Sequence, residues 1–427
     1  MASAPARVFD AVILADSPHA KTVILGLTIA ERGRRVAERI GARRVLVYDA
    51  SVDRDELARW EGERGDAALV VIRAGDQIVH PPLVQPLLAG AGGRRIAVGA
   101  DGVYAGALWA DAASASAVIT ALVASPSEGD RELIAGWSDA ERIEHGEIAR
   151  HPATTRDERR AATQWLLQIL VKSAEDSPIS KYIYRPLSRP LTRLLLHTPI
   201  TPNQVSYIVG LIGLLGCFLT ALPGQTNLIW GAALVFISGI IDGCDGEIAR
   251  IKLTSSTFGA WLDTIVDELT TMSYFIAIGL HTVHLHPQPW VGASIAIGAI
   301  CYVASIYGIY YFCVVVIKRG GSQYYVGDLV IVDDRDGPAL TPRPRMTRPR
   351  PVWMQNVGQI MLYMIRRDFI NLAAFGLTFL NLYAVIYLGM LLGNVVAAIV
   401  IVPEHLALRR QLGELRRRGG SPRFVAA

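Results

Sequence analysis

The sequence is poor in charged residues, which excludes some classes of protein at the outset. Only 19% of its 427 residues are charged, 51% are hydrophobic and the mean hydropathy is +0.32. A typical soluble domain carries about 25% charged residues, so the composition favours a chain that is partly embedded in a membrane. The net charge of +4 gives no case for nucleic-acid binding.

Cysteine is scarce, and the start of the chain lacks a secretory signal. No Cys-x-x-Cys pair or His/Cys spacing typical of a metal site occurs, and the cysteines lie in apolar segments: Cys217, Cys244, Cys301 and Cys313. We therefore expect small apolar packing residues and no disulfide framework. The apolar run 23–30 is too short to span a bilayer and has no basic segment before it. These absences predict that the N-terminal region stays in the cytoplasm.

Residues 1–150 read as a globular domain. Short apolar runs at 11–14, 45–48, 68–72 and 95–99 alternate with charged, helix-like stretches. This alternation predicts an α/β domain with a mainly parallel sheet. Residues 151–200 are expected to form a connector that ends in an amphipathic helix. In that helix, at 182–197, Leu and Ile stand between Arg residues, which suits the membrane interface.

Long apolar runs dominate residues 201–405 and predict six membrane-spanning helices. Their expected ranges are 204–222, 228–244, 258–281, 290–317, 358–381 and 384–403. The connections 223–227 and 282–289 contain no Lys or Arg, whereas basic residues follow the second, fourth and sixth helices. The positive-inside rule then places both termini in the cytoplasm, including the basic tail 406–427. Residues 318–356, rich in Pro and Arg, are expected to be an extended cytoplasmic loop.

Four aspartates form two pairs in this apolar half. Asp242 and Asp245 are three residues apart near the end of the second predicted helix. Asp263 and Asp267 are four apart near the start of the third. Residues at these spacings share one helix face, and a short connection allows the two faces to meet at the cytoplasmic side. Ionisable side chains at membrane depth are costly and normally mark a functional site.

Four converging carboxylates would repel one another unless cations lay between them. Hard oxygen ligands favour Mg²⁺ or Mn²⁺, and four carboxylates can hold two ions. Two ions can stabilise the attacking and leaving oxygens of a phosphoryl displacement, while one aspartate takes the proton of the attacking hydroxyl. A single aspartate is usually a helix cap, but helix packing does not require four acids at these spacings.

Small residues accompany the aspartates. Gly246, Ala249 and Gly259 leave space beside the helix backbones, which a nucleotide could fill. Arg250 could pair with one of its phosphates. Thr201-Pro202-Asn203-Gln204 is a capping-box pattern that predicts the start of the first spanning helix.

The arrangement resembles that of CDP-alcohol phosphotransferases. Residues 242–267 match D-x-x-D-G-x-x-A-R-x8-G-x-x-x-D-x-x-x-D at every fixed position, and TPNQVS at 201–206 is also similar to this family. The resemblance covers about residues 180–405. It implies a homodimer in which the four aspartates bind metal and Asp267 is also the base. It further implies that cytidine diphosphate is received by Gly246, Ala249, Arg250 and Gly259, with Asn203 at a recurrent family position.

The N-terminal domain is similar to sugar-nucleotide transferases of the cytidylyltransferase type. The similarity lies in residues 11–16, 26–50 and 75–88, and residues 175–192 resemble the junction in fused inositol-phosphate cytidylyltransferase/di-myo-inositol phosphate phosphate synthases. The glycine-rich loop that follows the first strand in such enzymes is missing, although amides close to a triphosphate need those glycines. We therefore expect an inactive domain, in which Lys21 and Asp76 are remnants of a site or simply surface residues.

The sequence says least about the substrates. Arg366 and Arg367 open the fifth predicted helix, where they could hold a phosphate of the acceptor or act as a positive-inside anchor. The donor could be CDP-diacylglycerol or a CDP-linked polar alcohol, and the fusion-like junction favours inositol chemistry. His281, His284 and His286 lie on the side opposite the aspartates and are expected to be solvated loop residues.

These features predict an α-helical six-transmembrane bundle with an N-terminal soluble α/β, nucleotidyltransferase-like domain. The expected reaction moves a substituted phosphate from a CDP-linked donor to an alcohol and releases CMP, in phospholipid or inositol-phosphate lipid biosynthesis. The alternative is a membrane transporter with an acidic cation site. A transporter would place the aspartates near the midplane of discontinuous helices, whereas here they are expected at the cytoplasmic helix ends.

Overall fold

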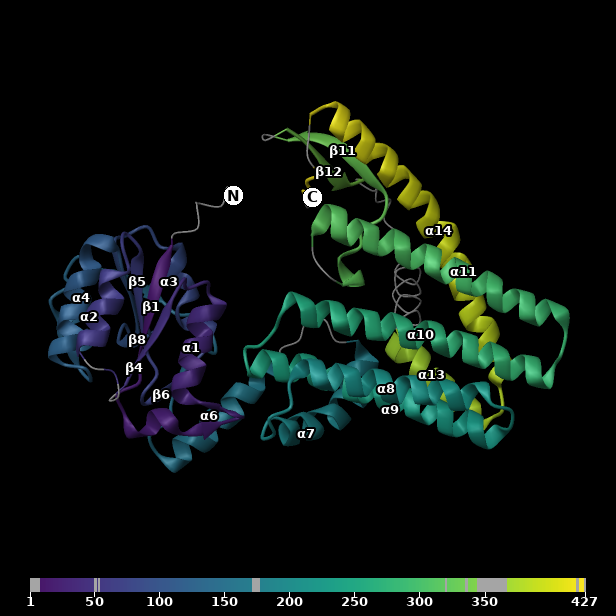
Figure 1. Ribbon diagram of the computed structural model, residues 1–427, viewed down its shortest axis with the longest axis horizontal. Coiled ribbons are helices and arrows are strands. Elements are labelled where there is room, and N and C mark those ends of the chain that lie inside the picture. Colours follow the sequence, from purple (N-terminus) through teal and green to yellow (C-terminus); the bar gives the residue numbers. More distant parts are fainter. Residues whose placement is uncertain are drawn as a thin grey trace. The chain divides into compact units, whose positions relative to one another are not determined.

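The computed structural model of the chain divides into two compact units (Figure 1). The first comprises residues 1–174, 193–199 and 247–254, and the second comprises residues 175–192, 200–246 and 255–427. The residues that the structure describes are 8–49, 52, 54–170, 177–318, 321–334, 337–343, 367–419 and 422–425.

The first unit is built on a six-stranded sheet in the order β4-β1-β5-β8-β7-β9. The strands are β1 (Phe9–Leu14), β4 (Val45–Tyr48), β5 (Ala68–Arg73), β7 (Arg94–Val98), β8 (Tyr104–Ala110) and β9 (Glu141–Glu144). All four predicted strands form, and β1 pairs in parallel with β4 and β5. The sheet is mixed because β8 runs antiparallel to both of its neighbours. A tight turn at Gly102 (φ +73°) reverses the chain between β7 and β8.

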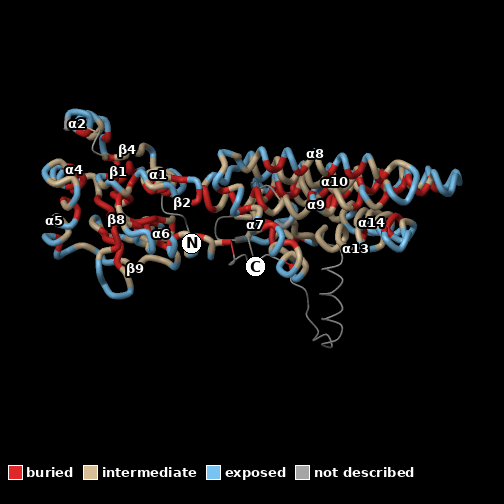
Figure 2. The backbone as a smooth tube through the Cα atoms, turned by 90° about the horizontal axis from the view of Figure 1, so that it is seen from below, coloured by how far each residue is buried: buried red, intermediate tan, exposed pale blue. Residues whose placement is uncertain are grey.

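Helices pack on this sheet and enclose an apolar core. They are α1 (Ile29–Arg39), α2 (Arg54–Gly62), α3 (Gln85–Ala89), α4 (Ala112–Ala124), α5 (Gly129–Ala135) and α6 (Arg156–Leu167). Short strands add two pairs, β2 (Val23–Ile24) with β3 (Leu27–Thr28) and β6 (Gln77–Val79) with β10 (Arg150–Pro152). Val12, Leu69 and Leu108 of the sheet are completely buried, and β1 and β8 are drawn largely in the buried colour in Figure 2.

The second unit is mainly helical. Its elements are α7 (Arg185–Leu195), α8 (Pro202–Ala221), α9 (Gln225–Ile251), α10 (Thr257–Leu285), α11 (Pro289–Phe312), β11 (Leu329–Asp334), β12 (Gly337–Pro342), α13 (Arg367–Phe379) and α14 (Tyr383–Arg417). The last residues of α7 and of α9 are assigned to the first unit. The start of α8 is fixed by the predicted capping box, in which Thr201 and Gln204 satisfy each other's backbone amides. Helices therefore occur at all six predicted positions, although residues 358–366 of the fifth lie outside the described part.

Four of these helices are long and apolar enough to cross a membrane: α8, α9, α11 with the turn that continues it to Ile317, and α14. Spans at α10 and α13 remain predictions. Large apolar side chains point outward along the unit, such as Leu211 (71% exposed) and Ile300 (69% exposed), while polar Thr220 and Thr378 are buried. Lipid is the solvent that accepts such an outer surface. The chain is thus an integral membrane protein.

Two expectations about this unit are wrong. Residues 329–334 and 337–342 of the expected extended loop form β11 and β12, which pair antiparallel. His281 is 1% exposed within α10 and donates from Nδ1 to the Leu222 carbonyl at 2.9 Å, so it is not a solvated loop residue. His284 and His286 are exposed, as expected. All four cysteines are free.

Candidate active site

The acidic site lies where α9 ends and α10 begins. Both helices are continuous through the aspartates, with Asp242 and Asp245 near the end of α9 and Asp263 and Asp267 in the first turns of α10. Ser256 caps α10, since its Oγ accepts a hydrogen bond from the Gly259 amide at 2.9 Å. The short connection between the helices brings the two aspartate pairs to one place.

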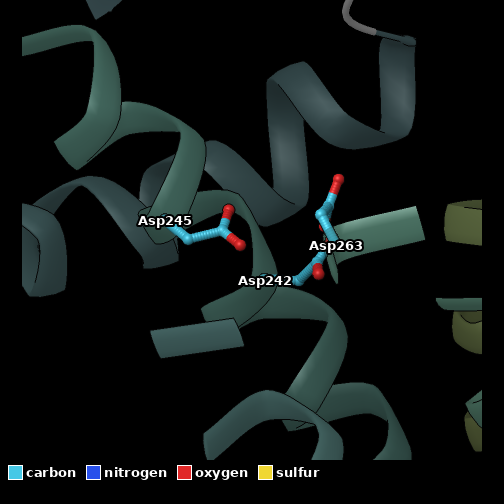
Figure 3. Close-up of side chains that lie close together, drawn as sticks. All are labelled: Asp242, Asp245 and Asp263. Atoms are coloured by element: carbon cyan, nitrogen blue, oxygen red, sulfur yellow. The ribbon is translucent and has the colours of Figure 1, made fainter. Parts of the chain in front are cut away.

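Three carboxylates gather at the centre of the site (Figure 3). One oxygen each from Asp242, Asp245 and Asp263 lies within 4.8 Å of the others. Asp245 is the most deeply placed of the three, at 8% exposed. Negative charges at such a separation repel strongly where water is scarce, so the cluster requires positive charge beside it.

Asp245 is held by neighbours on two sides. Its Oδ2 accepts a hydrogen bond from the hydroxyl of Ser206 on α8, and its Oδ1 accepts one from the amide of Gly246. These bonds fix the carboxylate relative to α8, which packs along α10. The position of Asp245 thus depends on α8 as well as on its own helix, α9.

Arg367, the first residue of α13, connects the remaining aspartate to the cluster. Its Nη2 donates to Asp242 Oδ2 at 2.6 Å, and its Nη1 forms an ion pair with Asp267 Oδ1. Arg367 was a candidate for binding a phosphate of the acceptor; here its charge faces two aspartates. Its neighbour Arg366 lies outside the described residues.

The donor set fits a divalent metal. Oxygens that bind one Mg²⁺ at about 2.1 Å lie at most about 4.2 Å apart, close to the 4.8 Å limit within which the three oxygens lie. Small rotations of the side chains would allow Asp242, Asp245 and Asp263 to share one ion. Carboxylate ligands are typical of Mg²⁺ and Mn²⁺ rather than of softer metals.

The residues predicted to bind the nucleotide lie on α8, α9 and α10. A Cβ added to Gly259 would lie 3.1 Å from Asn203 Oδ1, so the structure places Asn203 and Gly259 side by side. Gly246 directly follows Asp245, and Ala249 and Arg250 lie one turn further along α9. The structure therefore keeps these small residues adjacent to the acidic cluster.

Two polar side chains of the site were missed by reasoning from sequence. Ser206 binds Asp245, and a signal for it existed because Ser206 lies three residues after Asn203 and so shares its face of α8. Arg185 of α7 approaches Gly243, whose added Cβ would lie 2.9 Å from Arg185 Nη1. No spacing rule could connect residues so distant in the sequence.

The first unit contains a cavity of about 200 Å³ where β1 and β5 end. In a parallel arrangement this edge is the usual place for a nucleotide. The cavity is lined by Asp16, Asp76 and Glu128, while the lining Arg73 pairs with Asp130 at 2.5 Å. Asp76 thus lines this cavity, whereas Lys21 does not. The acidic lining of this cavity would repel a triphosphate.

Comparison with known proteins agrees with the geometry of the acidic site. A family model described as CDP-alcohol phosphatidyltransferase matches residues 199–339. The C-terminal half contains a CDP-alcohol phosphatidyltransferase domain. The matched residues include all four aspartates, whereas Arg367 lies after them in the sequence.

Curated relatives of the CDP-alcohol phosphatidyltransferase domain include bifunctional enzymes and lipid synthases. The bifunctional IPC transferase and DIPP synthase of Aquifex aeolicus is 30% identical over 145 residues, which are 33% of this chain and 32% of the relative. The same-named protein of Rubrobacter xylanophilus is 46% identical over 96 residues, 22% of this chain and 21% of the relative. The phosphatidylinositol phosphate synthase of Corynebacterium glutamicum is 33% identical over 117 residues, 27% of this chain and 51% of the relative. This chain thus matches about a third or less of the length of the bifunctional relatives.

Proposed function

We propose that this protein transfers a substituted phosphate from a CDP-linked donor to an alcohol and releases CMP. The observation that carries the proposal is the meeting of Asp242, Asp245 and Asp263 inside a domain of the CDP-alcohol phosphatidyltransferase family. A transporter has no need of the small residues Gly246, Ala249 and Gly259 next to the aspartates. We also propose that the site faces the cytoplasm, as the basic residues at the C-terminal ends of α9 and α14 favour.

The residues of the site have separate tasks in this reaction. Asp267 takes the proton of the acceptor hydroxyl, because Arg367 engages its Oδ1 and leaves Oδ2 for the proton. The hydroxyl oxygen then forms a bond to the phosphorus that carries the substituent. The bond from that phosphorus to the bridging oxygen breaks, and CMP leaves with the oxygen.

The four aspartates and the small residues also bind and orient the substrates. Asp242, Asp245, Asp263 and Asp267 would hold two Mg²⁺ or Mn²⁺ ions, which supply charge stabilisation to the phosphates when bound. Gly246, Ala249 and Gly259 admit the cytidine diphosphate, with Asn203 beside Gly259 and Arg250 directed to a phosphate. The active form is proposed to be a homodimer in the lipid bilayer.

The names of the relatives favour an inositol-containing substrate. The Corynebacterium glutamicum relative is a phosphatidylinositol phosphate synthase, and that of Pyrococcus horikoshii is an archaetidylinositol phosphate synthase. Both names describe products in which an inositol phosphate is joined to a lipid. We propose inositol phosphate as the acceptor and a lipid-linked CDP as the donor.

The test is an assay of CMP release by the purified full-length protein in lipid nanodiscs. CDP-diacylglycerol with inositol phosphate should release CMP only when Mg²⁺ or Mn²⁺ is present, whereas CDP-inositol with the same acceptor should not. Release from neither donor, with either metal, would contradict the proposal.

Substitution of the aspartates tests the site itself. Asp242→Asn and Asp263→Asn should each lower turnover at least about 100-fold, because each removes a negative ligand on which the cations depend. Glu414→Gln on α14 is the matched control, since Glu414 is exposed and its ion pair in the described part of the chain is with Arg418 on the same helix surface. Near-normal turnover in either aspartate variant would show that the cluster is not the catalytic site.

A further inference from the structure

A cavity of about 250 Å³ lies between the end of α11, the C-terminal part of α14 and the segment that leads into β11. It is lined by residues of four chain segments, the fourth being Arg343 after β12, and none of the four aspartates is among them. Figure 1 shows the β11–β12 hairpin beside the last turns of α14. The cavity is thus formed by elements outside the acidic site, and the proposed reaction does not use it.

One wall of the cavity presents a carboxylate. Glu404 follows Pro403 in α14, and its Oε2 accepts a hydrogen bond from the Tyr325 hydroxyl at 2.7 Å. Among the described residues, no Lys, Arg or His side chain forms an ion pair with Glu404. A carboxylate that lines a cavity and has no paired cation favours a ligand that supplies the positive charge.

Two further polar atoms in the lining are buried without a partner in the described part of the chain. Gln411 donates from Nε2 to the Leu329 carbonyl at 2.5 Å, but its Oε1 accepts no hydrogen bond. His405 is 8% exposed, and its Nδ1 also has no partner. Together with Glu404, Gln411 Oε1 gives the cavity a surplus of hydrogen-bond acceptors, which a ligand rich in N–H donors would satisfy.

The lining argues against a metal ion as this ligand. Asp328, the second carboxylate of the lining, is engaged by Arg343 at 3.3 Å. A divalent ion with a single remaining carboxylate would lack most of the six or more oxygens it needs. Phe312 and Tyr325 contribute aromatic surface, with their rings edge to face at 5.6 Å, and such surface suits an organic cation.

We propose that this cavity binds a primary ammonium group, with Glu404 as its counter-ion and Gln411 Oε1 as a second acceptor. The group could belong to an aminolipid headgroup or to a small soluble amine, because both present the same chemistry. The cavity lies on α14 just after the apolar part of the helix, where Arg409 and Arg410 follow. Headgroups lie at this level of a spanning helix.

Gly327 fixes the shape of the binding wall. A Cβ added there would lie 2.3 Å from Glu404 Oε2 and 2.5 Å from Oε1. Any larger residue at this position must displace the carboxylate. Gly327→Ala therefore perturbs the site without changing a charge.

The experiment uses the full-length protein and measures binding. In one arm, native mass spectrometry counts phosphatidylethanolamine retained by protein released from nanodiscs that also contain phosphatidylglycerol. In the other, calorimetry measures ethanolamine binding to protein in phosphatidylglycerol nanodiscs. At least one probe should bind saturably. If ethanolamine binds, choline should bind at least about fivefold more weakly. Choline carries the same positive charge but has no N–H donors.

Glu404→Gln should weaken binding about tenfold or more, which is the effect of losing one charged hydrogen bond. Gly327→Ala should also weaken binding. Glu414→Gln, on the same helix as Glu404, should leave the affinity within twofold of that of the wild type. Lipid retention alone would identify a headgroup site, and ethanolamine binding alone would identify a soluble amine. The proposal is overturned if neither probe binds, or if binding survives unchanged in Glu404→Gln. Should that variant not fold, unchanged binding in Gly327→Ala overturns it equally.

Discussion

Arg367 contacts two of the four aspartates, so this single side chain influences the charge of the whole site. Its guanidinium binds Asp242 and Asp267, which belong to different helices. The aspartates themselves could be predicted because a helix places residues three and four apart on one face. The pairing with Arg367 could not, because α13 is brought to the site by tertiary packing that leaves no periodic signal in the sequence.

We predict that Arg367→Ala lowers both the turnover and the metal concentration that the enzyme requires. Turnover should fall about tenfold because Asp242 and Asp267 lose the group that orients them. The metal concentration for half-maximal activity should also fall, because a competing cation has been removed. Titration of CMP release with Mg²⁺ measures both quantities, and Arg367→Lys should restore part of the metal dependence. A higher metal requirement in Arg367→Ala would contradict this interpretation.

We predict that His80 makes the stability of the first unit against unfolding depend on pH. Burial and the positive charge of nearby Arg32 lower the pKa of its imidazole to about 4, against about 6.5 in an unfolded chain. Above pH 6.5 both states are neutral, and between pH 6.5 and 4 only the unfolded state takes up a proton. Stability should therefore fall as the pH drops through this window, by about 2 kcal/mol at pH 5.

Hydrogen exchange of β1 and β5 in the full-length protein measures this loss, after correction for intrinsic exchange rates. His80→Gln has no titrating group at this position and should lose correspondingly less stability between pH 7 and pH 5. Equal losses in both proteins would assign the pH dependence to other groups.

At the level of elements, the fold was predictable wherever hydrophobic periodicity was strong. The strands at β1, β4, β5 and β7 and the six helices follow from apolar runs of suitable length. The β11–β12 hairpin was not predictable in this way, because its Pro- and Arg-rich surroundings resemble a loop and its strands are stabilised by packing against α14. The direction of β8 likewise depends on a turn rather than on the composition of the strand.

The contact between α8 and α9 depends on glycine. A Cβ added to Gly216 would lie 2.8 Å from the Gly231 carbonyl and 2.9 Å from Val235, so the two backbones approach closely. We predict that Gly216→Leu lowers the melting temperature and the yield of monodisperse protein. Gly389→Leu on α14 is the control, since nothing lies within 4 Å of its added Cβ, and it should behave like the wild type. Equal behaviour of the two variants would show that this close approach is not required.

For the whole molecule, we predict that only one of the two units is catalytic. The first unit keeps a cavity where β1 and β5 end, but Asp16, Asp76 and Glu128 line it and no glycine-rich loop follows β1. The full-length protein given CTP, inositol phosphate and Mg²⁺ should therefore release no pyrophosphate. The same preparation should release CMP from a supplied CDP-donor, which serves as the internal control. Metal-dependent pyrophosphate release would show that the acidic lining forms a working nucleotide site.

The distance along the chain between Asp267 and Arg367 has a consequence for biosynthesis. A ribosome adds about 5–20 residues per second, so the four aspartates are synthesised roughly 5–20 s before the arginine that neutralises two of them. During that interval the nascent helix pair needs another source of positive charge, either protons or dissolved cations. The order of synthesis thus gives metal ions access to the aspartates before Arg367 can compete for them.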